Sequence, residues 1–204
     1  NCCGNARDLN IDDVGFVRTM ISNIKAQMPI DPDRIFATGM SNGGLMAHRL
    51  ACDMADTFHA ISSVAGTDNT KTCHPTHPVS ILIIHALNDD HVLFNGGAGK
   101  EAFQKQNLDK VTEFTSVPDT VARWVKRNKC NAKPKRVFNV EDAYCDVYAT
   151  CAGNATVKLC VTEKGGHSWA GGQKPGRIKQ HSKEPTSQAI SANDMMWDFF
   201  MHNY

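Results

Sequence analysis

The segment from Arg34 to Gly44 constrains the fold more than any other part of the chain. It is a short apolar strand that runs into Gly-x-Ser-x-Gly, and a helix-forming segment, Leu45 to Cys52, follows at once. A sharp turn from strand to helix strains the backbone of the turn residue, and we expect Gly39 and Gly43 to remove Cβ atoms that would collide there. Ser41 would then stand exposed at the carboxyl edge of a sheet. Its Oγ would lie near a helix N-terminus, where backbone N–H groups and the helix dipole favour a developing negative charge.

An ordinary strand-to-helix turn is the alternative interpretation, because Gly-x-Ser-x-Gly is short enough to occur by chance. The flanking residues favour the catalytic interpretation. Residues 34–38 are strand-like, and Leu45, Met46 and Leu50 follow at helical spacing. The motif therefore stays a hypothesis until partners for the serine are found.

Two later residues can supply those partners. A serine hydroxyl becomes nucleophilic when a base removes its proton, and a third group must orient that base. In α/β-hydrolases the order is serine, acid, histidine, each near the end of a strand. Asp89 follows the apolar run 79–87, and His167 follows the last strand-like run, directly after Gly166. Asp90 is the alternative acid, and either carboxylate could instead be a solvated loop residue.

The remaining histidines have simpler interpretations. His91 next to two aspartates suggests a metal site, but three adjacent residues cannot all point inward, so we expect no metal. His85, within the apolar run, is expected to be a buried, hydrogen-bonded structural residue. Six others lie on helices or polar loops and are expected to be solvated: His48, His59, His74, His77, His181 and His202.

The order of elements predicts the fold class. Residues 1–10 are loop-like, and Asp12-Asp13 then caps an amphipathic helix. Strand-like runs alternate with helical ones, which predicts a doubly wound, mostly parallel α/β sheet. With no repeats and no clear linker, we expect residues 1–204 to form one domain. Further strands are expected at 60–65, 79–87, 143–148 and 157–162, further helices at 118–129 and 189–204, a loop or partial lid at 95–116 and a basic excursion at 173–185.

Charge and hydropathy exclude several kinds of partner. The formal net charge is +1 and no dense basic cluster occurs, so we expect no nucleic-acid partner. No apolar run is long enough to span a bilayer. We therefore expect the substrate not to be recognised by bulk charge.

The eight cysteines indicate an oxidising compartment. No CxxC pair suggests zinc or thioredoxin chemistry, so we expect disulfides and a secreted or periplasmic protein. The number of cysteines alone leaves about a hundred full disulfide connectivities open. Three pairs are plausible from their positions: Cys145 with Cys160 across a hairpin, Cys130 with Cys151, and Cys52 with Cys73.

Several motifs together resemble the poly(3-hydroxybutyrate) depolymerase and feruloyl esterase family, an α/β-hydrolase family. They are Asn1-Cys2-Cys3-Gly4, residues 12–16, Gly39-Met40-Ser41-Asn42-Gly43, residues 49–52, Val64-Ala65-Gly66, Gly165-Gly166-His167-Ser168-Trp169 and residues 197–200. The family's H-G-x-x-D motif implies Asp89 as the acid, although Ala86 replaces the glycine. The resemblance thus implies Ser41 as nucleophile, Asp89 as orienting acid and His167 as base.

The resemblance also implies what the chain lacks. Members of the family have further strands before the first helix, and a His-Gly loop among them donates one N–H to the oxyanion. Asn42 N–H supplies only half of such a hole. We expect an upstream segment of the same gene product that is separate or lost, or another loop that substitutes for it.

The predicted activity is a secreted serine ester hydrolase without a cofactor that acts on hydroxyalkanoate polyester or oligomers. Met40 and Trp169 are candidates to line the substrate pocket, although core packing is an equal alternative for Met40. Alternative functions are a feruloyl or acetyl esterase on plant polysaccharide, and a non-catalytic binding protein on a hydrolase scaffold. Fold alone does not separate these substrates.

Overall fold

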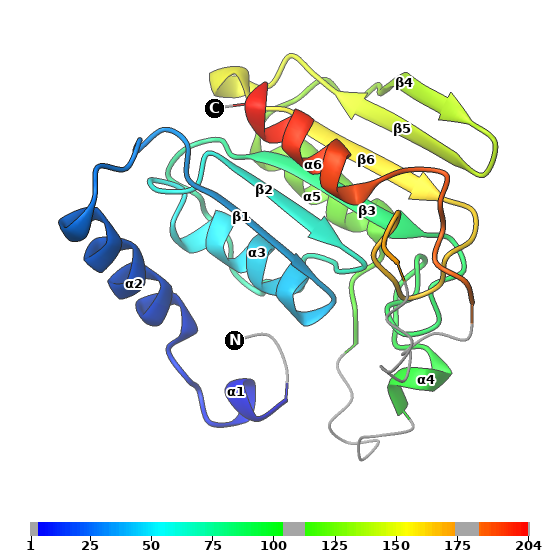
Figure 1. Cartoon of the computed structure of the whole chain (residues 1–204), viewed down its shortest axis with the longest axis horizontal. Helices are drawn as coiled ribbons and strands as arrows, with labels where there is room; N and C mark the ends of the chain where they lie inside the picture. The colour runs from blue at the N-terminus through cyan, green and yellow to red at the C-terminus, as the bar shows by residue number, and fades with distance from the viewer. Residues whose placement is uncertain (1–3, 104–112, 174–183, 204) are drawn as a thin grey trace.

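A computed structural model describes residues 4–103, 113–173 and 184–203 (Figure 1). The chain folds into a six-stranded sheet with helices around it. The elements in order are α1 (Gly4–Asp8), α2 (Asp13–Gln27), β1 (Phe36–Met40), α3 (Asn42–Asp53), β2 (Ala60–Val64), β3 (Ser80–Ala86), α4 (Lys100–Phe103), α5 (Val117–Arg127), β4 (Lys135–Val140), β5 (Ala143–Tyr148), the 3-10 turn η2 (Ala152–Asn154), β6 (Val157–Thr162) and α6 (Ala192–Met201).

The sheet has the strand order β1-β2-β3-β6-β5-β4. The pairs β1–β2, β2–β3 and β3–β6 are parallel, whereas β5 runs antiparallel to β6 and to β4. The prediction of a doubly wound, mostly parallel sheet is confirmed. The edge strand β4 was not predicted, because five of its six residues are exposed and it carries no buried apolar pattern.

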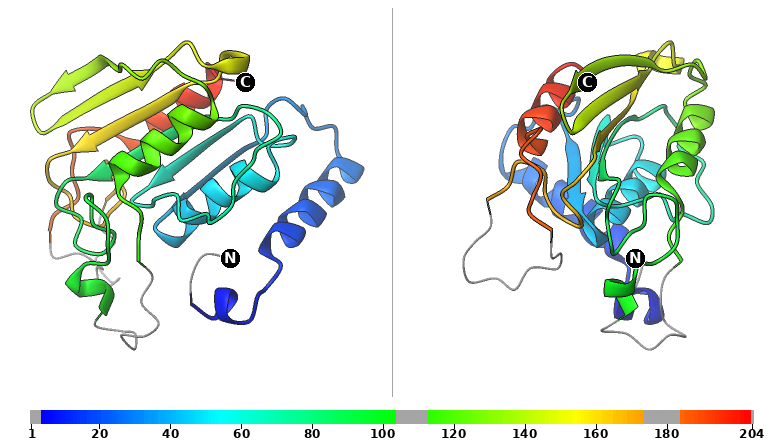
Figure 2. Two further views of the ribbon diagram at one scale, coloured as in Figure 1. Left: turned by 180° about the vertical axis from the view of Figure 1, so that it is seen from behind. Right: turned by 90° about the vertical axis from the view of Figure 1, so that its right-hand side faces the viewer.

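Helices cover both faces of the sheet, so the core has two halves. Residues of α3 and α5 form one half with the sheet, and Trp124 of α5 is completely buried there. Residues of α6, including Phe199 and Phe200, form the other half. The right-hand view of Figure 2 shows the sheet nearly edge-on, with α5 and α6 on opposite sides.

The helix α2 is capped at its N-terminus and lies at the surface. The Asp12 carboxylate accepts a hydrogen bond from Gly15 N–H (2.8 Å) and caps α2 as predicted. No residue of α2 is fully buried, and Phe16 is 69% exposed. The expectation that residues 1–10 are loop-like is wrong for Gly4–Asp8, which forms α1; a single turn of helix has no periodic apolar pattern by which it could be recognised.

The outer edge of β1 borders an apolar groove. In the described part of the chain β1 is an edge strand of the sheet, and α2 lies beyond it in Figure 1. The groove has a volume of ≈ 730 Å³ and is lined mainly by apolar side chains of α2, β1 and α6, including Ile24, Phe36, Trp197 and Phe200. A hydrophobic surface therefore adjoins the unpaired side of the strand that leads to Ser41.

Three disulfides join neighbouring segments, and all three predicted pairs are confirmed. Cys145–Cys160 links directly opposed residues of β5 and β6. Cys52–Cys73 ties the end of α3 to the loop after β2, and Cys130–Cys151 ties the segment after α5 to the turn after β5. Cys2 and Cys3 lie outside the described residues, as do most of the excursion at 173–185 and the middle of the expected lid at 95–116.

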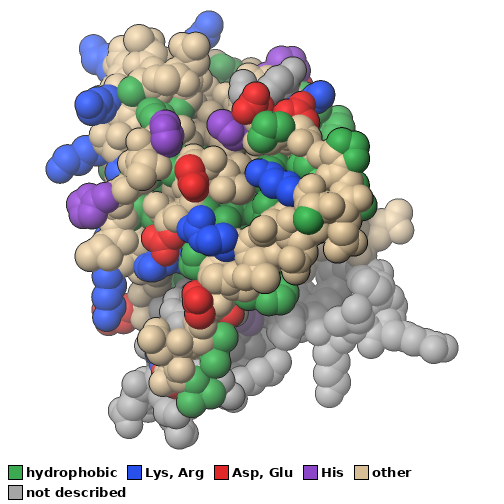
Figure 3. All heavy atoms as spheres, turned by 90° about the vertical axis from the view of Figure 1, so that its left-hand side faces the viewer, with side chains coloured by type: hydrophobic (Ala, Val, Ile, Leu, Met, Phe, Trp, Pro, Cys, Tyr) green, Lys and Arg blue, Asp and Glu red, His purple; other side chains and the backbone are tan. Residues whose placement is uncertain are grey.

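The surface over α2 carries mixed charge. Figure 3, which faces the side of the molecule with α2 in Figure 1, shows Lys and Arg, Asp and Glu and hydrophobic side chains interspersed on this face.

Among the described helices, none combines the length and the apolar character that a membrane span needs.

Candidate active site

The turn between β1 and α3 holds Ser41 in a strained backbone conformation, with φ 56° and ψ −120°. A positive φ is unusual for a residue other than glycine and clusters at functional sites. Gly39 is required as predicted, because a Cβ there would lie 2.4 Å from the carbonyl carbon of Gly43. The predicted need for Gly43 is wrong: a Cβ at that position would meet nothing within 4 Å. Gly44 is the second constrained glycine, because its Cβ would lie 2.5 Å from Ser63 Oγ.

The neighbours of Ser41 occupy the positions expected from the motif. Asn42 is the first residue of α3, so its backbone N–H belongs to the helix N-terminus directly after the serine. Met40 ends β1 and packs against the half of the core that contains Phe200. This packing agrees with the core interpretation of Met40, and its contact with a substrate stays a prediction.

Asp89 lies just after β3 and its carboxylate is completely buried. Oδ1 accepts hydrogen bonds from the backbone N–H groups of His91 and Val92, each at 2.9 Å. His167 Nδ1 lies 2.9 Å from Oδ2 and 3.1 Å from Oδ1. His85 Nε2 lies 3.3 Å from Oδ2 and also 2.8 Å from the carbonyl oxygen of Val92. Donors thus surround the carboxylate on both oxygens.

These contacts decide the charge of Asp89. Burial on its own would raise the pKa of Asp89, but the hydrogen bond and charge of His167, the charge of His85 and the His91 N–H outweigh it, so the pKa lies below its usual range. An ionised carboxylate only accepts hydrogen bonds, so His167 Nδ1 carries a proton. In neutral His167 the lone pair is then on Nε2, the atom that a general base uses.

His85 is buried and hydrogen-bonded, as predicted. Burial lowers the pKa of His85, although Asp89 and the Val92 carbonyl oppose this effect. Its Nδ1 has no hydrogen-bond partner among the residues that the structure describes. His85 Nε2 is therefore hydrogen-bonded to the Val92 carbonyl oxygen and lies next to the Asp89 carboxylate.

The structure brings Asp89 and His167 together and records no hydrogen bond between Ser41 and His167, both of which are described. It is Asp89 that contacts His167, while Asp90 contacts His91. The serine follows β1, the acid β3 and the histidine β6, and these strands are joined through parallel pairs. Parallel strands end at one edge of the sheet, so all three residues belong to the same edge.

Two further contacts shape the loops at this edge. Asn88 Oδ1 accepts a hydrogen bond from Gly166 N–H (2.9 Å) and so joins the acid loop to the histidine loop. The indole N–H of Trp169 donates to Asn193 Oδ1 at 3.0 Å, and the ring packs against the α6 half of the core. Trp169 is thus held by α6, and its predicted contact with a substrate is untested.

Asp89, His91 and His167 each offer one potential metal-ligand atom within 4.8 Å of the others. The ring arrangement does not favour an ion. The two imidazoles are stacked with centroids 4.6 Å apart and planes 17° apart. Nitrogen lone pairs lie in the ring planes, so in nearly parallel rings they do not converge on one point, as the ligands of a tetrahedral site must. Asp89 moreover occupies His167 Nδ1.

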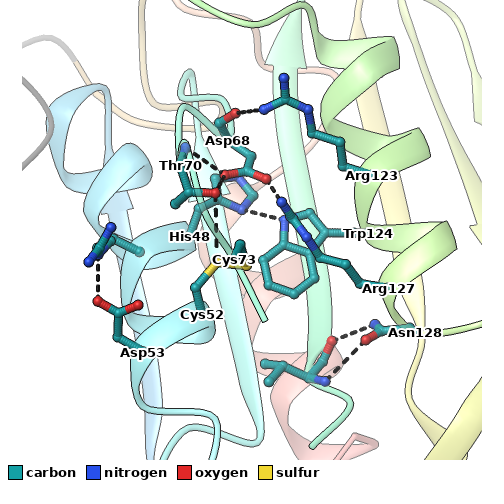
Figure 4. The surroundings of a disulfide bond; sticks show 12 residues. His48, Cys52, Asp53, Asp68, Thr70, Cys73, Arg123, Trp124, Arg127 and Asn128 are labelled. Atoms are coloured by element: carbon teal, nitrogen blue, oxygen red, sulfur yellow. Dashed lines mark hydrogen bonds and ion pairs between the residues drawn. A yellow bond between two sulfur atoms is a disulfide. The ribbon is translucent and has the colours of Figure 1, made fainter. Parts of the chain in front are cut away.

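His48 was predicted to be solvated, and this prediction is wrong: the residue is 0% exposed. Its Nδ1 accepts a hydrogen bond from the indole N–H of Trp124 at 3.0 Å (Figure 4). Burial lowers its pKa to about 4, more than nearby Asp68 raises it. Spacing could have indicated this, since Leu45, His48 and Cys52 recur at i, i+3 and i+7 on one face of α3.

Asp68 completes this buried network next to the Cys52–Cys73 disulfide (Figure 4). Its carboxylate contacts Arg127 and accepts a hydrogen bond from Thr70 N–H (3.0 Å). Burial would raise the pKa of Asp68, but the charges of His48 and Arg127 and the Thr70 bonds lower it overall. The network joins α3 to α5, and among the described residues none of its hydrogen bonds reaches the Asp89–His167 pair.

Comparisons with known proteins agree with the fold. A family model described as "Prolyl oligopeptidase family" matches residues 11–78, which include Ser41 but neither Asp89 nor His167. Feruloyl esterase B of Piromyces equi is 32% identical over 178 residues, 84% of this chain and 31% of that protein. "Putative esterase NocK" of Nocardia uniformis subsp. tsuyamanensis is 28% identical over 93% of this chain and 57% of its own length. Feruloyl esterase C of Emericella nidulans is 33% identical over 43% of this chain and 33% of its own.

The sheet, the strained serine turn and these relatives define an α/β-hydrolase. Within that superfamily the chain is similar to proteins named as esterases, in agreement with the predicted resemblance. It spans about a third of the length of the two feruloyl esterases and 57% of NocK. The poly(3-hydroxybutyrate) depolymerase part of the resemblance stays a prediction.

Proposed function

We propose that this protein is a serine-dependent carboxylic ester hydrolase in which Ser41 is the nucleophile, His167 the general base and Asp89 the orienting acid. One observation carries the proposal: a buried Asp89–His167 pair lies at the sheet edge where a serine occupies a strained strand-to-helix turn. The names of the relatives support the same class of reaction.

The reaction has two halves. His167 Nε2 takes the Ser41 proton as Oγ attacks the ester carbonyl, and the Asn42 N–H stabilises the resulting oxyanion. The C–O bond to the alcohol then breaks, and the imidazolium of His167 returns the proton to the departing alcohol. Water, deprotonated by the same nitrogen, releases the acid and restores Ser41. Substrate binding must bring Oγ within hydrogen-bond distance of Nε2, a contact that commonly tightens only in the substrate complex.

The direct test is substitution of Ser41 by alanine. Turnover of a short-chain p-nitrophenyl ester should vanish while the circular dichroism spectrum stays unchanged, because only a hydroxyl is removed from a turn. A serine-directed phosphonate should label the native protein at Ser41. If the folded native protein neither turns over ester nor is labelled, it is a binding protein on a hydrolase scaffold.

For the substrate we propose an ester of an aromatic acid such as ferulate, because two of the relatives described above carry that name. A hydroxyalkanoate polyester or oligomer is the other substrate predicted from the sequence. Rates on methyl ferulate and on hydroxybutyrate oligomers, measured side by side, decide between them. The three disulfides support a secreted or periplasmic protein, because such bonds persist in oxidising compartments.

We also propose that the domain is N-terminally incomplete, and that further strands of the same gene product extend the sheet beyond β1 and bring the second oxyanion donor. The unpaired edge of β1 and the apolar groove beside it support this. Loss of one donor costs about 10²–10³ in kcat in a well-studied protease, so the second donor matters for rate. Intact mass of the purified protein compared with its reading frame tests the proposal, and an encoded mature product that begins at Asn1 would contradict it.

A further inference from the structure

We propose that His91 is a positioning residue for His167: its imidazole stacks on the base and holds the plane of that ring. The inference rests on the proposed function, because it concerns how the proposed base is oriented. The two ring centroids are 4.6 Å apart and the ring planes differ by 17°.

The stack is built into the turn that holds the acid. Asp89 Oδ1 accepts from the backbone N–H of His91 itself and of Val92, so the carboxylate and the His91 ring are parts of one short loop. One carboxylate therefore sets the position of both imidazoles: it contacts His167 through the side chain and His91 through the backbone.

Separate contacts hold the His91 ring and its backbone. Its Nδ1 lies 2.8 Å from Asp90 Oδ1, and since a carboxylate only accepts, this nitrogen carries a proton. Its carbonyl oxygen accepts a hydrogen bond from Gly99 N–H at 2.9 Å, and Val92 pairs with Ala98 in an antiparallel bridge. The ring is thus anchored at both its edge and its backbone.

The hydrogen bond from His167 Nδ1 to the Asp89 carboxylate does not by itself fix the plane of the ring, which keeps some freedom to turn. A planar group against the ring face removes this freedom, because turning would break the stack. His91 also shields that face: its side chain is 17% exposed and that of His167 is 4% exposed. The role of His91 is therefore to keep Nε2 aimed at the Ser41 side, and it depends on a flat ring rather than on basicity.

Three substitutions test the inference in the full-length protein. His91→Ala removes the stack and should lower kcat by about 10- to 100-fold, the range expected from a misplaced reacting group. KM for the p-nitrophenyl ester should change by less than about twofold, because His91 holds the base rather than the substrate. His91→Phe restores a flat ring and should recover kcat to within about threefold, whereas His91→Leu fills similar space without a plane and should not.

The rate of phosphonate labelling of Ser41 should fall in His91→Ala and His91→Leu and recover in His91→Phe. His74→Ala, which removes an exposed loop histidine, is the matched control and should leave kcat unchanged. If His91→Ala fails to fold, the comparison of Phe with Leu decides: equal kcat in these two variants overturns the inference, as does unchanged kcat in folded His91→Ala. If the proposed function itself is wrong, the native protein will show neither turnover nor labelling. This outcome differs from failure of the His91 inference, in which the native protein stays active.

Discussion

Acid should destabilise this protein through His48, a residue outside the proposed catalytic group. His48 Nδ1 accepts the indole N–H of Trp124, so a proton can be added there only by breaking that hydrogen bond. The side chain is completely buried, and its pKa falls from 6.5 to about 4. Between these two pH values the unfolded chain binds a proton that the folded protein does not, and stability therefore falls as the pH falls.

The size of the effect follows from the same two pKa values. The linkage relation gives a loss of about 2.5 kcal/mol in the free energy of unfolding between about pH 7.5 and about pH 4.5. His85, also buried with a lowered pKa, adds to the loss in the same range. The pKa values of Asp68 and Asp89 are lowered from 3.8 in the folded protein. The stability that their ionised carboxylates contribute is therefore lost as the pH falls below 3.8.

His48→Gln isolates the histidine, because the glutamine carbonyl can accept the Trp124 N–H and has no proton to gain in this range. Urea unfolding at the two pH values and constant ionic strength, with the disulfides intact, measures the free energy of unfolding of both proteins. The native protein should lose about 2.5 kcal/mol more than the variant, with His85 contributing equally to both. Losses equal within about 0.5 kcal/mol would refute the assignment of a neutral, titrating His48.

Two further predictions concern the backbone and the crosslinks. Gly99→Ala should cost about 1–3 kcal/mol in the free energy of unfolding and lower kcat, because its Cβ would lie 1.8 Å from the carbonyl oxygen of Asp90 and displace the loop that holds Asp89 and His91. Gly43→Ala is the matched control for stability, since that Cβ meets nothing within 4 Å; equal denaturation midpoints for the two variants would contradict the steric argument. Replacing Cys145 and Cys160 together by alanine should remove about 3 kcal/mol, because the bond closes a 15-residue separation, and denaturant unfolding under non-reducing conditions measures it. An unchanged unfolding free energy would show that the opposed β5–β6 strands need no crosslink.

The elements that the sequence predicted best have strong local patterns. The run predicted at 79–87 contains β3, all seven residues of which are buried, and the stripe with Val121, Trp124 and Val125 forms the buried face of α5. The strand β4 was missed because five of its six residues are exposed and its apolar residues do not alternate regularly with polar ones. Local periodicity reports burial, so an exposed edge strand leaves little signal.

At the candidate site, too, the sequence predicted some features correctly and missed others. Residue order and the Gly-x-Ser-x-Gly motif were enough to choose Ser41 and His167 as candidates, whereas Asp89 was preferred to Asp90 through the family resemblance. The structure pairs Asp89 with His167. The glycine requirement was predicted correctly for Gly39 and wrongly for Gly43. The requirement for Gly44, which was not predicted, comes from Ser63 of β2 and Gly66 after it, and the motif contains neither residue.

From the sequence alone came the residue types, their order along the chain and the alternation of strands and helices, because hydrophobic spacing and turn chemistry act over a few neighbouring residues. The tertiary structure decided that Asp89 rather than Asp90 contacts His167, that His91 lies flat against the same ring, and that His48 is buried rather than solvated. Each of these depends on packing between segments far apart in the chain. Neighbouring carboxylates such as Asp89 and Asp90 have the same local signals whichever way that packing directs them.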